Sequence, residues 1–160
     1  MSKSPENALY RTSPVFKKRI TQLIYRQNCT SKKEFAALVG VSEPTITRAT
    51  LDGIIPTVPV LVTIADALEI PVEYLLGRSD HDRLTPAEVP ASFHIRIEQL
   101  KRERNTNYGE ICKKMRFPRT YFYEWLKEKT FPCVDYLVAI ADYFGVSADY
   151  LLGRTDLRLR

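Results

Sequence analysis

The sequence predicts an all-α protein made of two tandem five-helix units joined by a short linker. Three observations support this prediction. The heptapeptide YLLGRSD at 74–80 returns as YLLGRTD at 150–156. Short apolar segments at helical spacing precede each copy. A length of 160 residues with a period of 76 suits two small domains better than one larger domain.

The repeat extends well beyond the heptapeptide. At an offset of 76, 13 of the 25 positions from 56 to 80 are identical. Between 31 and 55 only Glu34 matches, with Glu110, and farther upstream the offset becomes 77. The two units therefore descend from one ancestor. The domains predicted are an N-terminal arm at 1–14, a first unit at 15–80, a linker at 81–91 and a divergent second unit at 92–160.

The first helix of unit one is expected at about 15–28, where four apolar side chains recur at helical spacing: Phe16, Ile20, Leu23 and Ile24. The second helix begins with SKKE, a capping box of Ser31 and Glu34, and NYGE repeats this chemistry with Asn107 and Glu110. The shared capping chemistry explains the isolated Glu34 to Glu110 identity.

Three further helices follow in the first unit. Gly40 suits a left-handed helix end, and Ser42 is the next N-cap. The third helix is expected at about 43–51 and the fourth at about 58–68. Pro71 opens a fifth helix that ends at Gly77.

Composition excludes several classes of protein. The chain is 44% hydrophobic and 27% charged, and its apolar runs are too short to cross a bilayer. The first residues have no signal-peptide pattern, which predicts a cytoplasmic protein. A net charge of +5 is mild and adds little to a nucleic-acid interpretation. Cys29, Cys112 and Cys133 match neither a disulfide framework nor a zinc pattern.

The stretch EFAALVGVSEPTITRA has the spacing of a helix-turn-helix. Ala36 is small where two helices cross, and Gly40 lies at the turn. The residues expected to face the core are Phe35, Val39, Val41, Ile46 and Ala49. Together with Pro56 and IADALEIPVEYLLG, this stretch closely resembles the lambda-repressor and Cro-like family of DNA-binding domains. The resemblance covers 15–80 and, less well, 92–156.

The resemblance implies a compact five-helix domain whose third helix enters the DNA major groove. It places Lys32 and Lys33 near phosphates, which the free N–H groups of a helix start also favour. Arg48 suits guanine O6 and N7. The remaining DNA-binding positions of unit one are Ser42, Glu43, Pro44, Thr45 and Thr47. The alternative is that the cations are only a solvated face.

The second unit departs from the family pattern. Arg116 stands at the position of the turn glycine, where a left-handed conformation would cost about 1 kcal/mol. Pro118 replaces the capping Ser, and Cys112 replaces the small Ala as a core residue. The apolar core is retained at Ile111, Met115, Phe117, Phe122 and Trp125.

Two interpretations of the second unit's exposed face stay open. As a second DNA reader it would use Arg116, Arg119, Thr120, Tyr123 and Lys127. Alternatively it is a degenerate copy whose exposed aromatic side chains meet protein, because such residues are enriched in protein interfaces.

The expected function is sequence-specific regulation of transcription, as a repressor, with double-stranded DNA as the partner. Such a role is common for this family on bacterial chromosomes, phages and mobile elements. Two linked units form a covalent pseudo-dimer, in which each raises the effective concentration of the other at DNA. The last helices offer a surface for a further homodimer. The alternative function is an antitoxin-like protein whose first unit binds DNA and whose second unit binds a protein.

No enzyme, cofactor or metal site is expected. His81 and His94 are the only histidines, and although Asp80 and Asp82 flank His81, the segment SDHD lies in the predicted linker without further ligands.

Overall fold

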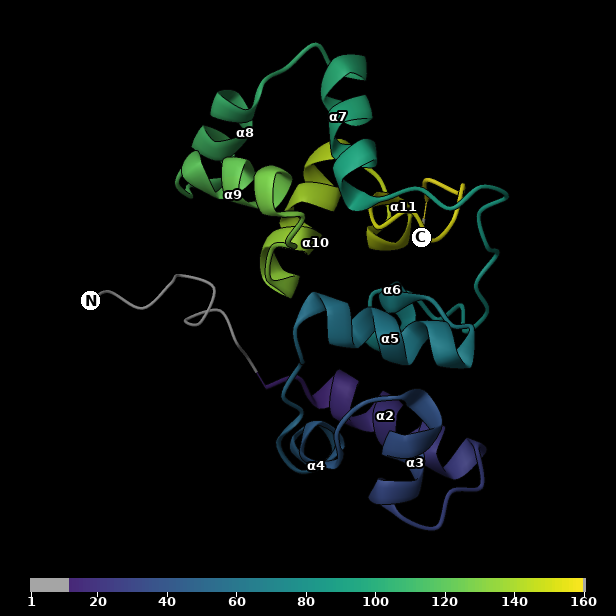
Figure 1. The fold of residues 1–160 in the computed structure, drawn as a ribbon. Helices are drawn as coiled ribbons and strands as arrows, with labels where there is room; N and C mark the ends of the chain where they lie inside the picture. The colour runs from purple at the N-terminus through teal and green to yellow at the C-terminus, as the bar shows by residue number, and fades with distance from the viewer. Residues whose placement is uncertain (1–11, 160) are drawn as a thin grey trace, which may run out of the picture. The chain divides into compact units, whose positions relative to one another are not determined.

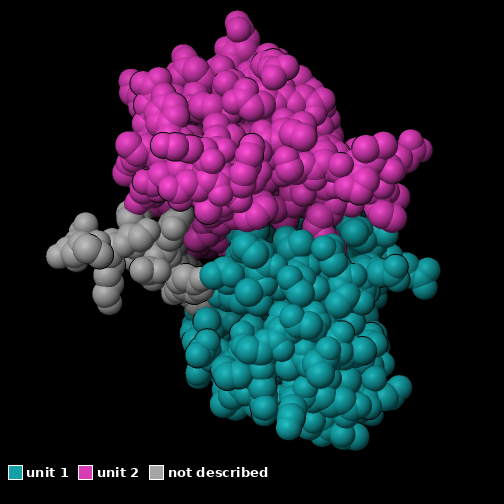
Figure 2. Space-filling model, in the orientation of Figure 1, with its two compact units in different colours: residues 1–84 teal, residues 85–160 magenta. Residues whose placement is uncertain are grey.

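The computed structural model describes residues 12–159, and the chain separates into two compact units, residues 1–84 and 85–160 (Figures 1 and 2). Within these described residues the regular structure is helical, apart from one isolated antiparallel bridge between Thr12 and Ile54. The all-α prediction is thus confirmed. Residues 1–11 of the predicted N-terminal arm lie outside the described residues.

Within residues 12–84 the first unit contains five helices whose ends follow the capping residues. They are α2 (Pro14–Arg26), α3 (Lys32–Val39), α4 (Glu43–Asp52), α5 (Val58–Leu68) and α6 (Val72–Leu75) (Figure 1). Ser13 caps α2 by accepting a hydrogen bond from the Phe16 N–H at 3.1 Å, and Pro14 supplies a first helical residue that needs no N–H partner. Every helix predicted for this unit is present within a few residues of its expected bounds.

The chain enters the first unit through a close backbone contact. The Ser13 N–H donates to the Gly53 carbonyl at 2.8 Å, beside the Thr12 to Ile54 bridge. Gly53 is left-handed, with φ of 68°, and a Cβ there would lie 2.4 Å from the Ser13 carbonyl oxygen. Residues 12 and 13, predicted as part of the arm, therefore pack on the unit, and only glycine fits at position 53.

The core of unit one is formed where α2, α3, α4, α5 and α6 meet. Its fully buried large side chains are Phe16, Ile20, Leu23, Phe35, Ile46, Leu61, Ile64 and Leu75. Ile24 and Val41, also expected to face this core, are only half-buried. Val41 lies in the turn between α3 and α4, and Ile24 lies at the edge of the buried stripe of α2.

The second unit contains α7 (Phe93–Glu103), α8 (Tyr108–Met115), α9 (Thr120–Glu128), α10 (Val134–Phe144) and α11 (Ala148–Leu151) (Figure 1). Its core is aromatic around α9: the Phe122 ring stacks on Tyr108 at 4.6 Å and meets Trp125 edge-on at 5.1 Å. Ile111, Phe117, Phe122 and Trp125 are buried as expected, whereas Met115 is half-buried.

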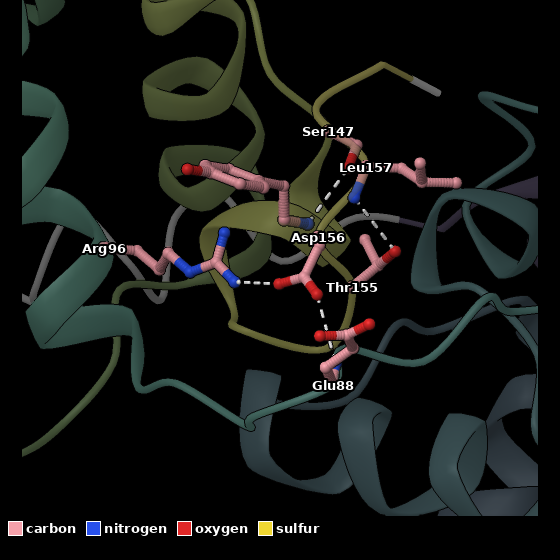
Figure 3. A network of polar contacts seen from close by, with 7 residues as sticks. Glu88, Arg96, Ser147, Thr155, Asp156 and Leu157 are labelled. Atoms are coloured by element: carbon pink, nitrogen blue, oxygen red, sulfur yellow. Dashed lines mark hydrogen bonds and ion pairs between the residues drawn. The ribbon is translucent and has the colours of Figure 1, made fainter.

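The repeated heptapeptide fastens the end of each unit to its first helix. In unit one the Arg19 guanidinium lies 3.9 Å from the Tyr74 ring centroid and pairs with Asp80 at 3.1 Å. In unit two Arg96 lies 4.0 Å from the Tyr150 ring centroid and pairs with Asp156 at 3.1 Å, as Figure 3 shows for the ion pair. The tyrosine and the aspartate recur in both heptapeptides because, in each unit, both contact the arginine of the first helix.

A second ion pair explains the arginine of the heptapeptide. Arg78 pairs with Glu73 at 2.9 Å, and Arg154 pairs with Asp149 at the equivalent positions of unit two. Glu73 and Asp149 are nearly fully buried, and Arg154 is too. Buried charges need such partners, so these pairs constrain the sequence of the last turn in both units.

Candidate nucleic-acid interface

The start of α3 presents two lysines beside free backbone N–H groups. Ser31 caps the helix by accepting from the Glu34 N–H at 3.0 Å. The Glu34 carboxylate accepts from the Thr30 backbone N–H at 2.9 Å and from the Thr30 hydroxyl at 2.7 Å, and these bonds lower the pKa of Glu34. The capping box thus closes on Thr30, one residue before the N-cap.

Lys32 and Lys33 are the first two residues of α3, the former half-buried and the latter exposed. Neither forms an ion pair with any residue in the described part of the chain. The helix dipole and the free N–H groups of the first turn add to their positive charge. This end of the helix suits a phosphate group.

The turn between α3 and α4 is built on a left-handed glycine. Gly40 has φ of 79°, and its N–H donates to the Ala36 carbonyl at 2.9 Å. Ser42 then caps α4 by accepting from the Thr45 N–H at 3.3 Å, and the two hydroxyl oxygens lie 2.7 Å apart. Ala36, nearly fully buried, lets the two helices cross closely.

The outer face of α4 carries the predicted base-reading residues of unit one. Glu43, Pro44 and Arg48 are exposed, and Thr47 is half-buried. Thr45 is half-buried and its hydroxyl is engaged with Ser42, so it is part of the helix start. The structure therefore brings the predicted set together on the first two turns of a single helix.

Arg48 lies on the rim of a shallow hollow of about 260 Å³ beside α4. The other lining residues are Thr45, Ile54, Ile55, Pro56, Thr57 and Val60. Sequence reasoning did not assign the loop residues among them to the site, since helical periodicity carries no information about a loop.

The second unit preserves this arrangement with altered caps. Asn107 caps α8 by accepting from the Glu110 N–H at 2.9 Å. Arg116 adopts the left-handed conformation, with φ of 60° and ψ of 41°, as predicted for the position of the glycine. Cys112 is buried as expected of a core residue, and burial raises the pKa of its thiol.

The start of α9 differs from that of α4. Pro118 cannot cap with its side chain, so the N-cap moves to Arg119, whose side chain forms no capping bond. The Arg119 guanidinium instead folds back over α8. Its Cζ lies only 3.4 Å from the position that a Cβ on Gly109 would occupy. Arg119, Thr120, Tyr123 and Lys127 are all exposed.

The cations of the chain fall into two groups. Most of those of the first helices and the last turns are bonded: Arg19, Arg26, Arg78, Arg96, Lys101, Arg104, Arg154 and Arg158. The exceptions there and in the segment after the first heptapeptide are Lys17, Lys18, Arg83 and Arg102, which form no ion pair with a described residue. Those of α3, α4, α8, α9 and the residues that end α8 and α9 form no ion pair with any described residue: Lys32, Lys33, Arg48, Lys113, Lys114, Arg116, Arg119, Lys127 and Lys129. Most of the unpaired positive charge among residues 12–159 therefore lies on the two helix pairs.

Other kinds of site find little support. In the described range 12–159, no three His, Cys, Asp or Glu side chains are grouped so as to hold a metal ion. His81 is exposed, whereas His94 is buried with its Nε2 2.9 Å from the Thr130 carbonyl oxygen. No helix within these residues is long and apolar enough to span a membrane.

In unit one, α3 and α4 cross at a small residue, are joined by a left-handed glycine, and expose a polar face on the second, capped helix. These are the features of a helix-turn-helix motif. Comparison with family models agrees, because residues 24–75 match the model described as helix-turn-helix. Residues 24–75, about a third of the chain, are therefore similar to the helix-turn-helix family. The match ends within α6 of the first unit. Searches of curated proteins and of solved structures return no match.

Proposed function

We propose that this protein is a sequence-specific transcriptional repressor of the cytoplasm that reads operator DNA with α4 of unit one and α9 of unit two. The observation that carries the proposal is the placement of unpaired cations. Lys32 and Lys33 stand at a helix start that suits phosphate, and Arg48 projects from the exposed face of the next helix. Positioning and base reading are thereby divided between two adjacent helices.

Unit one has the clearer division of roles. Lys32 and Lys33 contact the phosphate backbone and set the register of α4 in the major groove. Arg48 then donates two hydrogen bonds to a guanine edge, while Ser42, Glu43, Pro44 and Thr47 line the same groove.

Unit two is proposed as a second reader with a different preference. The segment 107–129 holds six unpaired cations against three carboxylates, which favours DNA over a neutral surface. Arg119 packs over Gly109 at the start of α8, and on that ground we assign its guanidinium to contacts with the DNA backbone. Base reading in unit two then belongs to Thr120, Tyr123 and Lys127, and Arg116 adds charge beside the groove.

The second candidate is an antitoxin-like protein in which unit two binds a protein partner. The half-exposed Tyr123 on α9 is the observation that favours it, because exposed tyrosine is common in interfaces. A homodimer is a further partner arrangement that this candidate allows.

Selection from a pool of random duplexes tests both candidates. The repressor proposal expects the full chain to enrich a bipartite, imperfectly symmetric motif, since α4 and α9 differ in sequence. Arg48→Ala is expected to degrade one half of this motif and Thr120→Ala with Tyr123→Ala the other. Enrichment of a single half-site that only Arg48→Ala degrades would favour the second candidate, and no enrichment would refute both.

A further inference from the structure

The residues after the first heptapeptide pack on their own unit. Asp80 pairs with Arg19, and Asp82 pairs with Arg26 at 3.2 Å, so both carboxylates bind side chains of α2. The Leu84 N–H donates to the Glu69 carbonyl at the end of α5 at 3.2 Å. We call residues 80–84 the first strap, because they are held at three points along their length.

The residues that lead into unit two are held by that unit. The Ala87 N–H donates to the Arg154 carbonyl at 3.1 Å, and the Glu88 N–H donates to Asp156 Oδ2 at 3.0 Å (Figure 3). A Cβ on Gly153 would lie 1.8 Å from the Ala91 carbonyl oxygen, so the backbone packs directly on this left-handed glycine. Residues 87–91 form the second strap.

Only Thr85 and Pro86 lie between the straps, and neither makes a hydrogen bond to any residue from 12 to 159. The three peptide steps from Leu84 to Ala87 reach at most about 10 Å. A free linker of residues 81–91 would instead average about 18 Å between its ends and extend much farther. Pro86 also fixes its own φ and restricts Thr85.

A reversal of charge matches the first strap to unit one. At the repeat offsets, Arg26 corresponds to Glu103 and Asp82 corresponds to Arg158. Arg158 forms two hydrogen bonds of 2.8 Å with Glu103, so the ion pair is kept with its signs exchanged. Residues 80–84 placed on α7 would bring Asp82 against Glu103, and like charges oppose that exchange.

We infer that residues 80–91 are two straps around a two-residue joint and that this joint limits the two helix-turn-helix units to a narrow range of half-site spacings on DNA. The spacing part of the inference rests on the proposed function. A tether determines effective concentration through its length, so a short joint favours one spacing where a long linker would tolerate several.

Amide hydrogen exchange of the full chain tests the straps without DNA. The amides of Leu84, Ala87 and Glu88 are expected to exchange at least about tenfold more slowly than in an unstructured peptide. Asp156→Ala should release Glu88, whereas the matched control Asp80→Ala should leave Glu88 protected. Exchange of all three amides at unstructured rates would overturn the inference.

DNA binding tests the spacing. In the selected bipartite duplex, we insert two base pairs between the half-sites. This insertion is expected to lower the affinity of the wild-type chain for the duplex by at least about tenfold. For a variant with eight Gly and Ser residues inserted between Thr85 and Pro86, the same two base pairs should lower the affinity by no more than about threefold. Equal tolerance by both proteins, or a motif with one half-site, would overturn the spacing claim. Failure to enrich any motif would refute the proposed function and leave the straps to be judged by hydrogen exchange.

Discussion

The buried ion pair between Arg154 and Asp149 gives a sharp prediction of stability. The two side chains are only 6% and 4% exposed, so an isosteric Asp149→Asn change removes the negative charge from a buried ion pair. Removing one partner of such a pair costs about 3–5 kcal/mol. A domain of this size has a total stability of about 5–15 kcal/mol, so unit two should lose much of its margin.

The matched control is Glu73→Gln in unit one. Arg78 is 20% exposed, so water can solvate its charge when the carboxylate is lost, and we expect a smaller cost of about 1–3 kcal/mol. Trp125 makes the comparison selective: it is the single tryptophan of the chain, it is buried, and it lies in unit two.

Urea unfolding followed by Trp125 fluorescence measures the effect. With a denaturant slope of about 1–1.5 kcal/mol per molar for such a small unit, Asp149→Asn should lower the midpoint by about 2–5 M. Glu73→Gln should leave the Trp125 transition in place while far-UV circular dichroism detects loss of helix in unit one. An Asp149→Asn midpoint within about 0.5 M of wild type would refute the assignment of this pair as essential.

Three further predictions concern single positions. Arg116→Gly should stabilise unit two by up to about 1 kcal/mol, because Arg116 is left-handed, whereas Arg116→Ala should give no gain; Trp125 fluorescence in urea distinguishes the two. Gly53→Ala should destabilise unit one by more than about 1–2 kcal/mol through its clash with Ser13, measured as an earlier circular dichroism transition with unchanged Trp125 fluorescence. The Tyr108 hydroxyl lowers the pKa of Glu98, so this carboxylate stabilises the fold above its unfolded pKa and ceases to do so as the pH falls through its folded pKa. Glu98→Gln should therefore cost stability at pH 7, and the cost should shrink as the pH is lowered below the ordinary Glu pKa of about 4.3; a cost that does not change with pH would exclude this role.

Local chemistry made the helices predictable from the sequence. Ser31, Ser42 and Asn107 were identified as caps by residue type and spacing, and each accepts the expected backbone hydrogen bond. Arg116 was placed in the left-handed turn by alignment with Gly40 alone. Such features depend on residues three or four apart, and short range is where sequence patterns are informative.

Long-range polar contacts were not predictable in the same way. Nothing in the heptapeptide itself indicates a partner for its aspartate, yet Asp80 binds Arg19 across 61 positions. The charge exchange between Arg26 and Glu103 becomes visible only when their partners are known. The residues bonded on either side of Thr85 and Pro86 likewise read as plain linker, because polar composition does not reveal what a backbone N–H will meet.

The same distinction between local and long-range contacts applies to the candidate site. The predicted residues of α4 lie together because they share one helix. The loop residues around Arg48 and the folding back of Arg119 over Gly109 depend on tertiary packing and were missed.

Affinity of Arg48→Ala for the selected duplex is the most direct test of base reading by α4. We expect the variant to lose about 1–3 kcal/mol of binding free energy, and only on duplexes that keep the guanine at one position. Discrimination between bases should therefore disappear at that base pair. Lys33→Ala is the control, and it should weaken all duplexes alike and reduce the salt dependence by about one unit of slope. A uniform loss for Arg48→Ala across selected and unrelated duplexes would contradict the claim that this helix reads sequence.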